Sequence, residues 1–149
     1  VLFGDETATE QDIIDSLKNA GLWETIEKLP NGLDTELGER GVNLSGGQKQ
    51  RLSIARALVR KTPILVLDDC LSAVDTETEH EILQNLKAAA EGVTAIIISH
   101  RVSSLKLADE ILVLDEGKLV ENGTHDQLMG LKGDYFDLYN KQVEHSKLD

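Results

Sequence analysis

The chain has 149 residues, of which 40% are hydrophobic, so it can bury the core of about one domain. Its 27 acidic and 15 basic residues give a formal net charge of −12, which disfavours nucleic acids and anionic lipid surfaces as partners. The single cysteine, Cys70, excludes an internal disulfide, and the start VLFGDETATE matches no signal peptide. No apolar run approaches the ~20 residues of a membrane span, so we expect a soluble globular chain.

Residues 1–60 read as a helical portion. The stretch Thr9-Glu10-Gln11-Asp12 predicts a helix start with Thr9 as its cap, followed by apolar residues on one helical face. A short helix is predicted over 22–28, and Pro30-Asn31-Gly32 then breaks the chain. A glycine-punctuated loop leads to NLSGGQKQR at 43–51, and after Ser45 the pattern is helical again.

Strands and helices alternate after residue 60. The apolar runs 64–67 and 95–98 show no polar alternation, which is typical of parallel strands covered on both faces. Between them we expect a helix capped by Asp75. A hairpin is predicted where 111–114 meets 118–120 across Asp115-Glu116-Gly117. The capping sequence that begins at Thr124 opens a terminal helical region, whose expected core residues are Leu128, Leu131, Phe136 and Leu138.

This alternation indicates an α/β fold with a mostly parallel sheet and helices on its faces. Ligands of such sheets bind outside the carboxyl ends of the strands. The two apolar runs end in Asp68-Asp69 and in Ser99-His100. We therefore expect the chemistry at these strand ends.

The turn Ser45-Gly46-Gly47 precedes a helix, and a helix N-terminus attracts phosphate through unpaired N–H groups and a partial positive charge. A bare S-G-G is more often only a cap and a turn. A chance match to the full pentapeptide 44–48 is on the order of one in ten thousand, so here the functional interpretation prevails.

The acidic residues at the first strand end suit nucleotide chemistry. Asp68 is placed to hold Mg²⁺ directly or through water, and Asp69 could orient or deprotonate an attacking water. A strand-terminal acidic turn explains them equally well when they are taken alone. His100 could donate a hydrogen bond to a terminal phosphate, although a lone histidine is more often structural. Cys70 reads as a small apolar filler rather than a nucleophile, and no zinc-type cluster is present in the sequence.

The ordered motifs LSGGQKQR, ILVLDD, LSAVD and IIISHR resemble the ATP-binding cassette of ABC transporters over nearly the whole chain. The resemblance implies part of the α-helical subdomain at 1–60. It also implies the C-terminal part of a P-loop NTPase (RecA-like) core at 61–149. The resemblance implies ATP and Mg²⁺ as cofactors. Ser45, Gly46, Gly47 and Gln48 would contact a partner's nucleotide, and Ser72 and Asp75 lie in the D-loop, which spans residues 72–75. Asp68 would hold Mg²⁺ through water, and Asp69 and His100 would take part in catalysis. The stretch TELGERG resembles the loop that touches the membrane domain in exporters, with Glu36, Glu39 and Arg40 as its contact residues.

The sequence departs from the family pattern in two ways. The P-loop pattern G-x-x-x-x-G-K-[ST] is missing, because the only Gly-Lys pair, Gly117-Lys118, is followed by Leu119 in the predicted hairpin. The position of the general-base glutamate holds Asp69, whose carboxylate is set back by one C–C bond of about 1.5 Å. A misplacement near 1 Å can lower a rate on the order of a hundredfold. This combination resembles the subunit of heterodimeric multidrug exporters that has one impaired ATP site.

The first hypothesis is therefore the C-terminal half of the ATPase domain of an ABC exporter, at the cytoplasmic face of a cell membrane. The resemblance implies two partners, a second cassette in a head-to-tail dimer and a transmembrane domain. Without a P-loop, the chain alone should be inactive and should expose an apolar face and a sheet edge.

Two alternatives remain. One is a nucleotide-gated dimerisation or regulatory piece with little hydrolysis. The other is a soluble ABC ATPase of the DNA-repair type, against which stand the acidic charge, the absence of coiled-coil heptads and the TELGERG loop.

Overall fold

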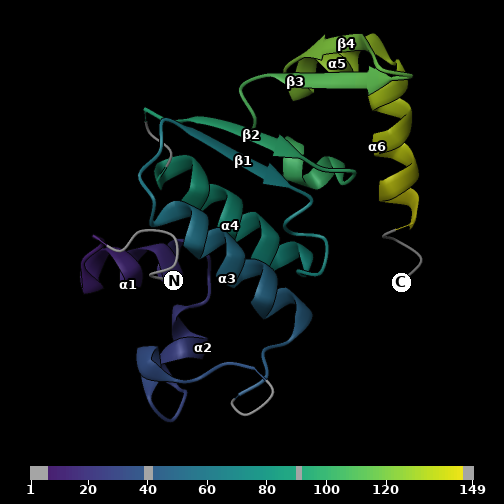
Figure 1. Cartoon of the computed structure of the whole chain (residues 1–149). Coiled ribbons are helices and arrows are strands. Elements are labelled where there is room, and N and C mark those ends of the chain that lie inside the picture. Colours follow the sequence, from purple (N-terminus) through teal and green to yellow (C-terminus); the bar gives the residue numbers. More distant parts are fainter. Residues whose placement is uncertain (1–6, 39–41, 90–91, 146–149) are drawn as a thin grey trace. The chain divides into compact units, whose positions relative to one another are not determined.

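The computed structural model describes residues 7–38, 42–89 and 92–145 (Figure 1). Contacts along the chain divide it into two compact units, residues 1–98 and residues 99–149. The boundary expected near residue 60 concerns the subdomains of a cassette, and it stays a prediction.

The first unit holds five helical segments within its described residues. The segments are α1 (Glu10–Asn19), α2 (Trp23–Glu27), the short 3-10 helix η1 (Gly32–Asp34), α3 (Gly46–Leu58) and α4 (Thr76–Ala89). Of these, α1, α3 and α4 start at the caps predicted at Thr9, Ser45 and Asp75.

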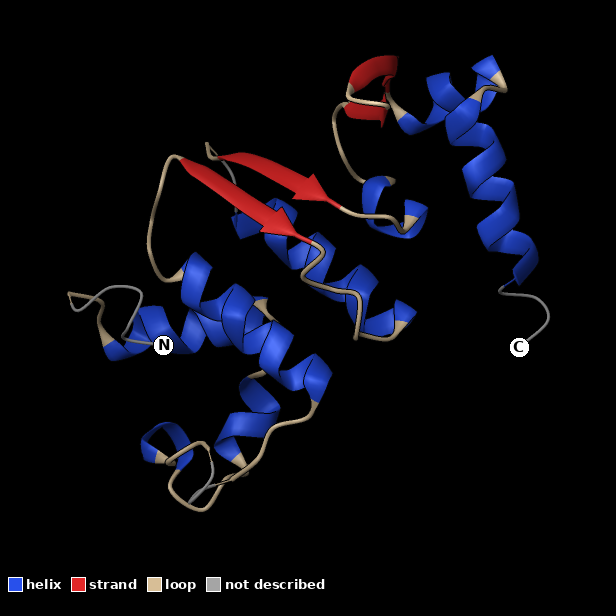
Figure 2. Cartoon of the chain, turned by 45° about the vertical axis from the view of Figure 1, so that its right-hand side comes forward, coloured by secondary structure: helices blue, strands red, loops and turns tan. Residues whose placement is uncertain are grey.

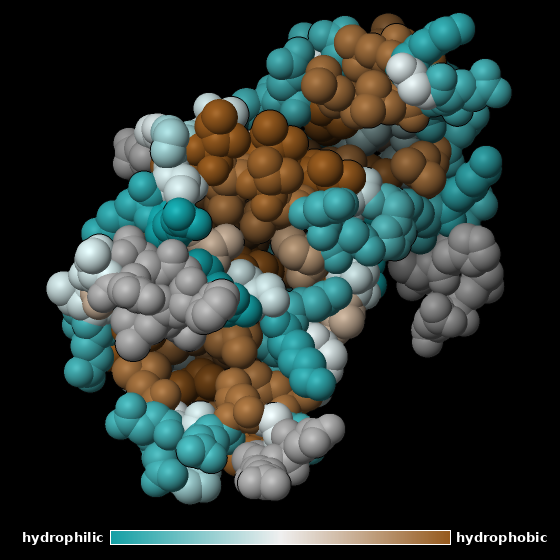
Figure 3. Space-filling model, in the orientation of Figure 1, coloured by the Kyte–Doolittle hydropathy of each residue, from teal (hydrophilic) through white to brown (hydrophobic). Residues whose placement is uncertain are grey.

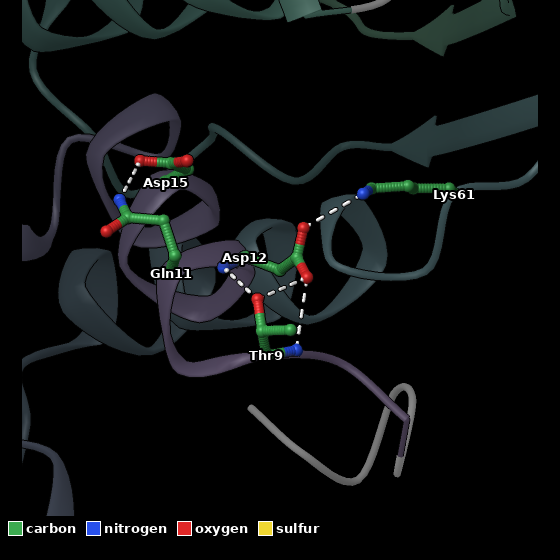
Figure 4. A network of polar contacts seen from close by, with 5 residues as sticks. All are labelled: Thr9, Gln11, Asp12, Asp15 and Lys61. Atoms are coloured by element: carbon green, nitrogen blue, oxygen red, sulfur yellow. Dashed lines mark hydrogen bonds and ion pairs between the residues drawn. The ribbon is translucent and has the colours of Figure 1, made fainter.

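The start of α1 is a reciprocal cap. The hydroxyl of Thr9 accepts from the backbone N–H of Asp12, and the carboxylate of Asp12 accepts from the backbone N–H of Thr9 (Figure 4). The Thr9 hydroxyl and the Lys61 ammonium also donate to this carboxylate, and these hydrogen bonds hold the pKa of Asp12 well below its usual range. Lys61 thereby ties the loop after α3 to the start of α1.

The sheet of the first unit consists of β1 (Ile64–Asp68) and β2 (Thr94–Ile98), which pair in parallel with Asp68 opposite Ile98. Helices α3 and α4 lie on the same side of this pair (Figures 1 and 2). Leu65 and Leu67 point to the helices and are buried. The alternation of burial along β1 follows from this one-sided cover.

The opposite face of β1 and β2 is open. Its apolar side chains include Ile64 and Val66, which are 58% and 55% exposed, and Figure 3 shows apolar surface over these strands. The cover on both faces that is typical of such apolar runs is not seen within the described residues, where helices pack on one face; the other face is the exposed apolar face expected of a chain without a P-loop. We call this surface the open sheet face, made of Ile64, Val66, Ile96 and Ile98.

The second unit begins with η2 (Val102–Leu105) and the predicted hairpin of β3 (Ile111–Asp115) and β4 (Lys118–Gly123). Glu116 and Gly117 have φ values of 46° and 75°, as the favoured two-residue hairpin turn requires.

The hairpin is followed by α5 (His125–Leu131) and α6 (Asp134–His145). The core of this unit contains Val102, Ile111, Leu128 and Tyr135.

The predicted core of the terminal helices is right for Leu128 and wrong for Leu131 and Leu138, which are 65% and 42% exposed; Phe136 is half-buried. The reason is a break in the helical period, because Lys132 adopts a left-handed conformation (φ 54°) and α6 starts afresh at Asp134. As a result, Tyr135 fills the core at 2% exposure. Among the described residues, no helix combines the length and the apolar character that crossing a bilayer requires.

Candidate functional site

The turn at Ser45 is shaped by a second reciprocal cap. The Ser45 hydroxyl accepts from the backbone N–H of Gln48 (3.3 Å), and the Gln48 side chain accepts from the backbone N–H of Ser45 (2.8 Å). Ser45 and Gly46 are exposed, so the N-terminus of α3 is accessible from solvent. The local sequence thus folds into a turn that presents a helix N-terminus, the arrangement that attracts phosphate groups.

Gly47 is where this turn meets the D-loop. A Cβ at position 47 would lie 2.7 Å from the carbonyl oxygen of Ala73, which is closer than real Cβ atoms come to other atoms. A Cβ at Gly46 would lie 3.9 Å from the side chain of Ala73, an ordinary contact. Glycine at 47 is therefore required by the close approach of two backbones, in addition to any approach of a ligand.

Gln50 bridges the same two segments one helical turn further on. Its amide nitrogen donates to the Ser72 hydroxyl (2.9 Å), and its amide oxygen accepts from the backbone N–H of Ala73 (2.9 Å). The Ser72 hydroxyl in turn donates to the carbonyl oxygen of Asp69 (3.1 Å). A chain of hydrogen bonds thus runs from α3 through the D-loop to the candidate base.

The backbone of Asp69 is held on both sides. Its N–H donates to the carbonyl of Ile98 (2.9 Å), and its carbonyl accepts from Ser72. Asp69 has a φ of 44°, in the left-handed region that few residues other than glycine adopt, although aspartate does so more readily than most. Backbone strain of this kind gathers at functional sites. The side chains of Asp69 and of Asp68, at the end of β1, are exposed.

The D-loop ends in a capped helix, as predicted. The carboxylate of Asp75 accepts from the backbone N–H of Thr78 (2.9 Å), and the hydrogen bonds from Thr78 together with the charge of Arg51 hold the pKa of Asp75 below its usual range. Burial raises the pKa of the half-buried Cys70 thiol to about 11, so the thiol is protonated at neutral pH. A protonated thiol is a poor nucleophile, which agrees with the interpretation of Cys70 as a filler.

His100 belongs to the second unit, and its side chain is exposed. The amide nitrogen of Gln142 donates to the carbonyl of His100 (2.6 Å), and the amide oxygen of Gln142 accepts from the backbone N–H of Val102 (2.9 Å). The Ser99 hydroxyl accepts from the backbone N–H of Arg101 (3.0 Å). The loop that carries His100 is therefore hydrogen-bonded to α6 at two peptide groups.

The structure brings the predicted residues together in part. The turn at 45–48 and the D-loop at 72–75 are in contact within the first unit, while His100 belongs to the second. Glu36 is exposed, and its carbonyl accepts from the backbone N–H of Val42 (3.0 Å). Glu39 and Arg40 lie outside the described residues.

Sequence reasoning did not identify Gln50 or Gln142. Gln50 could have been found, because it lies three residues after Gly47 and so on the same helical face. No local signal marks Gln142.

The acidic groups fit a magnesium ion that is shared with a nucleotide. In the described part of the chain, no group of three or more His, Cys, Asp or Glu residues comes together to hold a metal. Mg²⁺ in nucleotide sites takes one or two carboxylates and completes its shell with water and phosphate oxygens. A single strand-end carboxylate such as Asp68 meets that requirement.

Comparison with known proteins agrees with the motifs. A model of the ABC transporter family matches residues 1–72. The lipid A-core flippases of Pasteurella multocida and Methylobacillus flagellatus are 50% and 47% identical over 92% and 91% of this chain, which spans 24% and 23% of them. Multidrug resistance protein 4 of Entamoeba histolytica is 46% identical over 97% of this chain and 11% of its own length.

A solved structure is also similar to this chain. The chain is 44% identical to a bacterial Atm1-family ABC exporter with ATP bound, with a TM-score of 0.84 over 94% of this chain and 24% of that one. It spans about a quarter or less of the length of these relatives. The chain therefore fits part of the nucleotide-binding domain of an ABC transporter of the exporter type.

Proposed function

We propose that this chain is the C-terminal half of the ATPase domain of an ABC exporter, which couples the binding and hydrolysis of Mg-ATP to the transport of drugs, lipids or peptides across a membrane. The observation that carries the proposal is the joint between the turn at 45–48 and the D-loop, made by the close approach of Gly47 to Ala73 and by the hydrogen bonds of Gln50. The names of the relatives, lipid A-core flippase and multidrug resistance protein, support an exporter.

The turn at the start of α3 would bind the nucleotide of a second cassette. Ser45, Gly46 and Gly47 would place the helix N-terminus and the serine hydroxyl against the terminal phosphates of that ATP. Gln48 would act mainly through the cap, because its side chain already accepts from the backbone of Ser45. The head-to-tail pairing of two cassettes follows from this role, since the turn serves a nucleotide that is held elsewhere.

The strand ends would serve the chain's own nucleotide. Asp68 would hold Mg²⁺, directly or through water, and a bound Mg²⁺ supplies charge neutralisation for the phosphate oxygens. Asp69 would orient the attacking water or accept its proton, and His100 would donate a hydrogen bond to the terminal phosphate. The fixed backbone of Asp69 supports this role, because it limits where the carboxylate can point.

A membrane domain would contact the loop that contains Glu36, Glu39 and Arg40, which would place the chain at the cytoplasmic face of a membrane. The net charge of −12 argues against a nucleic-acid partner and therefore against a DNA-repair ATPase.

The test measures ATP hydrolysis by the full-length exporter in lipid vesicles. Asp68→Asn and His100→Ala should each lower kcat on the order of a hundredfold. Gln84→Ala on an exposed face of α4 is the control, and it should leave kcat unchanged. Wild-type kcat in both site variants would contradict the proposal.

A second candidate is a nucleotide-gated piece with little hydrolysis, and Asp69 at the glutamate position favours it. If the short carboxylate impairs this site, Asp69→Glu should raise ATP hydrolysis, while Asp69→Asn should abolish what remains. Asparagine tolerates the left-handed backbone as well as aspartate does, so Asp69→Asn also controls for conformation. Unchanged hydrolysis in Asp69→Glu would rule out impairment by the short side chain. Because its sequence lacks a P-loop, the chain alone should have negligible activity.

A further inference from the structure

The loop between β2 and η2 has a brace from the last helix of the chain. Gln142 donates to the carbonyl of His100 and accepts from the N–H of Val102, so one amide holds the peptide groups on both sides of Arg101. An amide is suited to this, because it carries a donor and an acceptor at a fixed separation. The Gln142 amide therefore joins the carbonyl of His100 and the N–H of Val102 to the same residue of α6.

The helix that carries the brace is itself firmly placed within the second unit. Tyr135, two helical turns before Gln142 on the same face, is 2% exposed and lies 2.8 Å from the His125 ring nitrogen through its hydroxyl. The carboxylate of Glu121 accepts from the backbone N–H groups of Asp134 and Tyr135 (2.6 and 3.2 Å) and so caps the start of α6. The position of the Gln142 amide is therefore set by the core of the unit.

Other contacts also hold this loop. Val102 is anchored by burial, at 1% exposure, and the Ser99 hydroxyl accepts from the N–H of Arg101. The Gln142 hydrogen bond ends on the carbonyl of the same peptide group, which links His100 to Arg101. Removal of Gln142 would take away the hydrogen bonds that tie both peptide groups of Arg101 to α6.

We propose that Gln142 is a positioning residue for the reaction: its amide fixes the main chain of His100 so that the imidazole is held where the terminal phosphate of ATP is bound. The proposal rests on the function assigned to His100 above. Gln142 does not touch the nucleotide, and its effect passes entirely through His100. A loop held in one conformation before substrate binds loses less freedom in the transition state.

The test uses the full-length exporter in lipid vesicles and measures kcat and the KM for ATP. Gln142→Ala should lower kcat about tenfold and leave KM within about twofold, because the released loop affects the geometry of the reacting groups more than ATP binding. Gln84→Ala makes the same side-chain truncation on an exposed helix and should change neither. Equal kcat in Gln142→Ala and Gln84→Ala, together with a low kcat in His100→Ala, would overturn the proposal and leave the proposed function intact.

A double-mutant cycle separates positioning from a general structural role. In the His100→Ala background, Gln142→Ala should cost no further activity, because the group that it positions is already absent. A full tenfold loss in that background would show that Gln142 acts on something else and would overturn the proposal. Wild-type activity in His100→Ala would overturn the proposed function and the positioning role together.

A conservative variant keeps the test usable if Gln142→Ala folds poorly. In Gln142→Glu the carboxylate can still accept from Val102, but it faces the carbonyl of His100, which has no proton to donate. Its kcat should therefore fall as in Gln142→Ala although the side chain keeps its size. Wild-type kcat in Gln142→Glu would show that the hydrogen bond to His100 has no role.

Discussion

Each unit of the chain contains a loop braced by one glutamine amide, and the two braces differ in origin. Gln50 lies on α3, whose own N-terminus is the turn at 45–48, and it holds the D-loop at Ser72 and Ala73. Gln142 lies on α6, at the far end of the chain, and it holds the His100 loop across a separation of about 40 residues. In the first unit, therefore, one helix begins at the turn at 45–48 and also holds the loop that follows Asp69.

The two braces also differ in how closely the backbones pack. At the first, the backbone of Gly47 approaches the carbonyl of Ala73 so closely that a side chain at 47 would clash. At the second, a long side chain spans the distance between helix and loop. The first joint therefore couples two segments by contact of their main chains, whereas the hydrogen bonds of Gln142 can be removed by the loss of one side chain.

The largest effect is expected at the close contact of the first joint. In Gly47→Ala the new methyl group meets a backbone oxygen that cannot rotate away, so α3 or the D-loop must shift, at a cost of about 1–3 kcal/mol in the free energy of unfolding. The measurement is denaturant unfolding of the complete nucleotide-binding domain.

The matched control for this substitution is Gly130→Ala. Gly130 lies in α5 with no heavy atom within 4 Å of an added Cβ, so alanine there should stabilise by about 0.5–1 kcal/mol. If Gly47→Ala and Gly130→Ala changed the free energy of unfolding by the same amount, the main-chain contact at Gly47 would not contribute to stability. The first joint would then not differ from the second in the way described.

Much of the first joint could be predicted from local sequence. Ser45 with Gln48, and Asp75 before α4, are caps whose partners lie three residues away, so their hydrogen bonds form as soon as the helix does. The hairpin turn at Glu116-Gly117 also depends on short-range pattern.

The braces could not be predicted, because their partners are distant in sequence. Gln50 and Gln142 are ordinary polar helix residues until folding brings a loop from 22 or 40 residues away against them. The open sheet face could be predicted from the missing P-loop but not from the strands themselves, since an apolar strand has the same sequence whether or not a second layer covers it. The left-handed conformation between Leu131 and α6 falls on Lys132 and not on the glycine that follows it, Gly133, so the sequence does not show where the helical period breaks.

A smaller effect is expected for the hydrogen bonds of the braces. Gln50→Ala and Ser72→Ala should each lower the free energy of unfolding by about 1 kcal/mol. The double variant should lose less than the sum, because the two substitutions remove one shared bond.

Gln50→Ala and Gln142→Ala should instead add to within about 0.5 kcal/mol, because they hold different loops in different units. Denaturant unfolding of the same domain measures both cycles. Strong coupling between the two substitutions would show that Gln50 and Gln142 stabilise one common network and not two separate loops.

The smallest effect concerns charge. The D-loop of the first unit ends at Asp75, and the hydrogen bonds from Thr78 hold the pKa of Asp75 below its usual range. The substitution Asp75→Asn keeps an acceptor for Thr78 but removes the charge. A carboxyl whose pKa is lowered by folding stabilises the fold above its unfolded value of about 3.9, and this contribution disappears as the pH falls through the folded value. The stability difference between wild type and Asp75→Asn should therefore be constant from pH 7 to pH 5 and shrink below pH 4. The difference between wild type and Gln142→Ala should show no such step, since an amide does not titrate in this range. A step of equal size in both would mean that the acid sensitivity belongs to the whole domain rather than to the end of the D-loop.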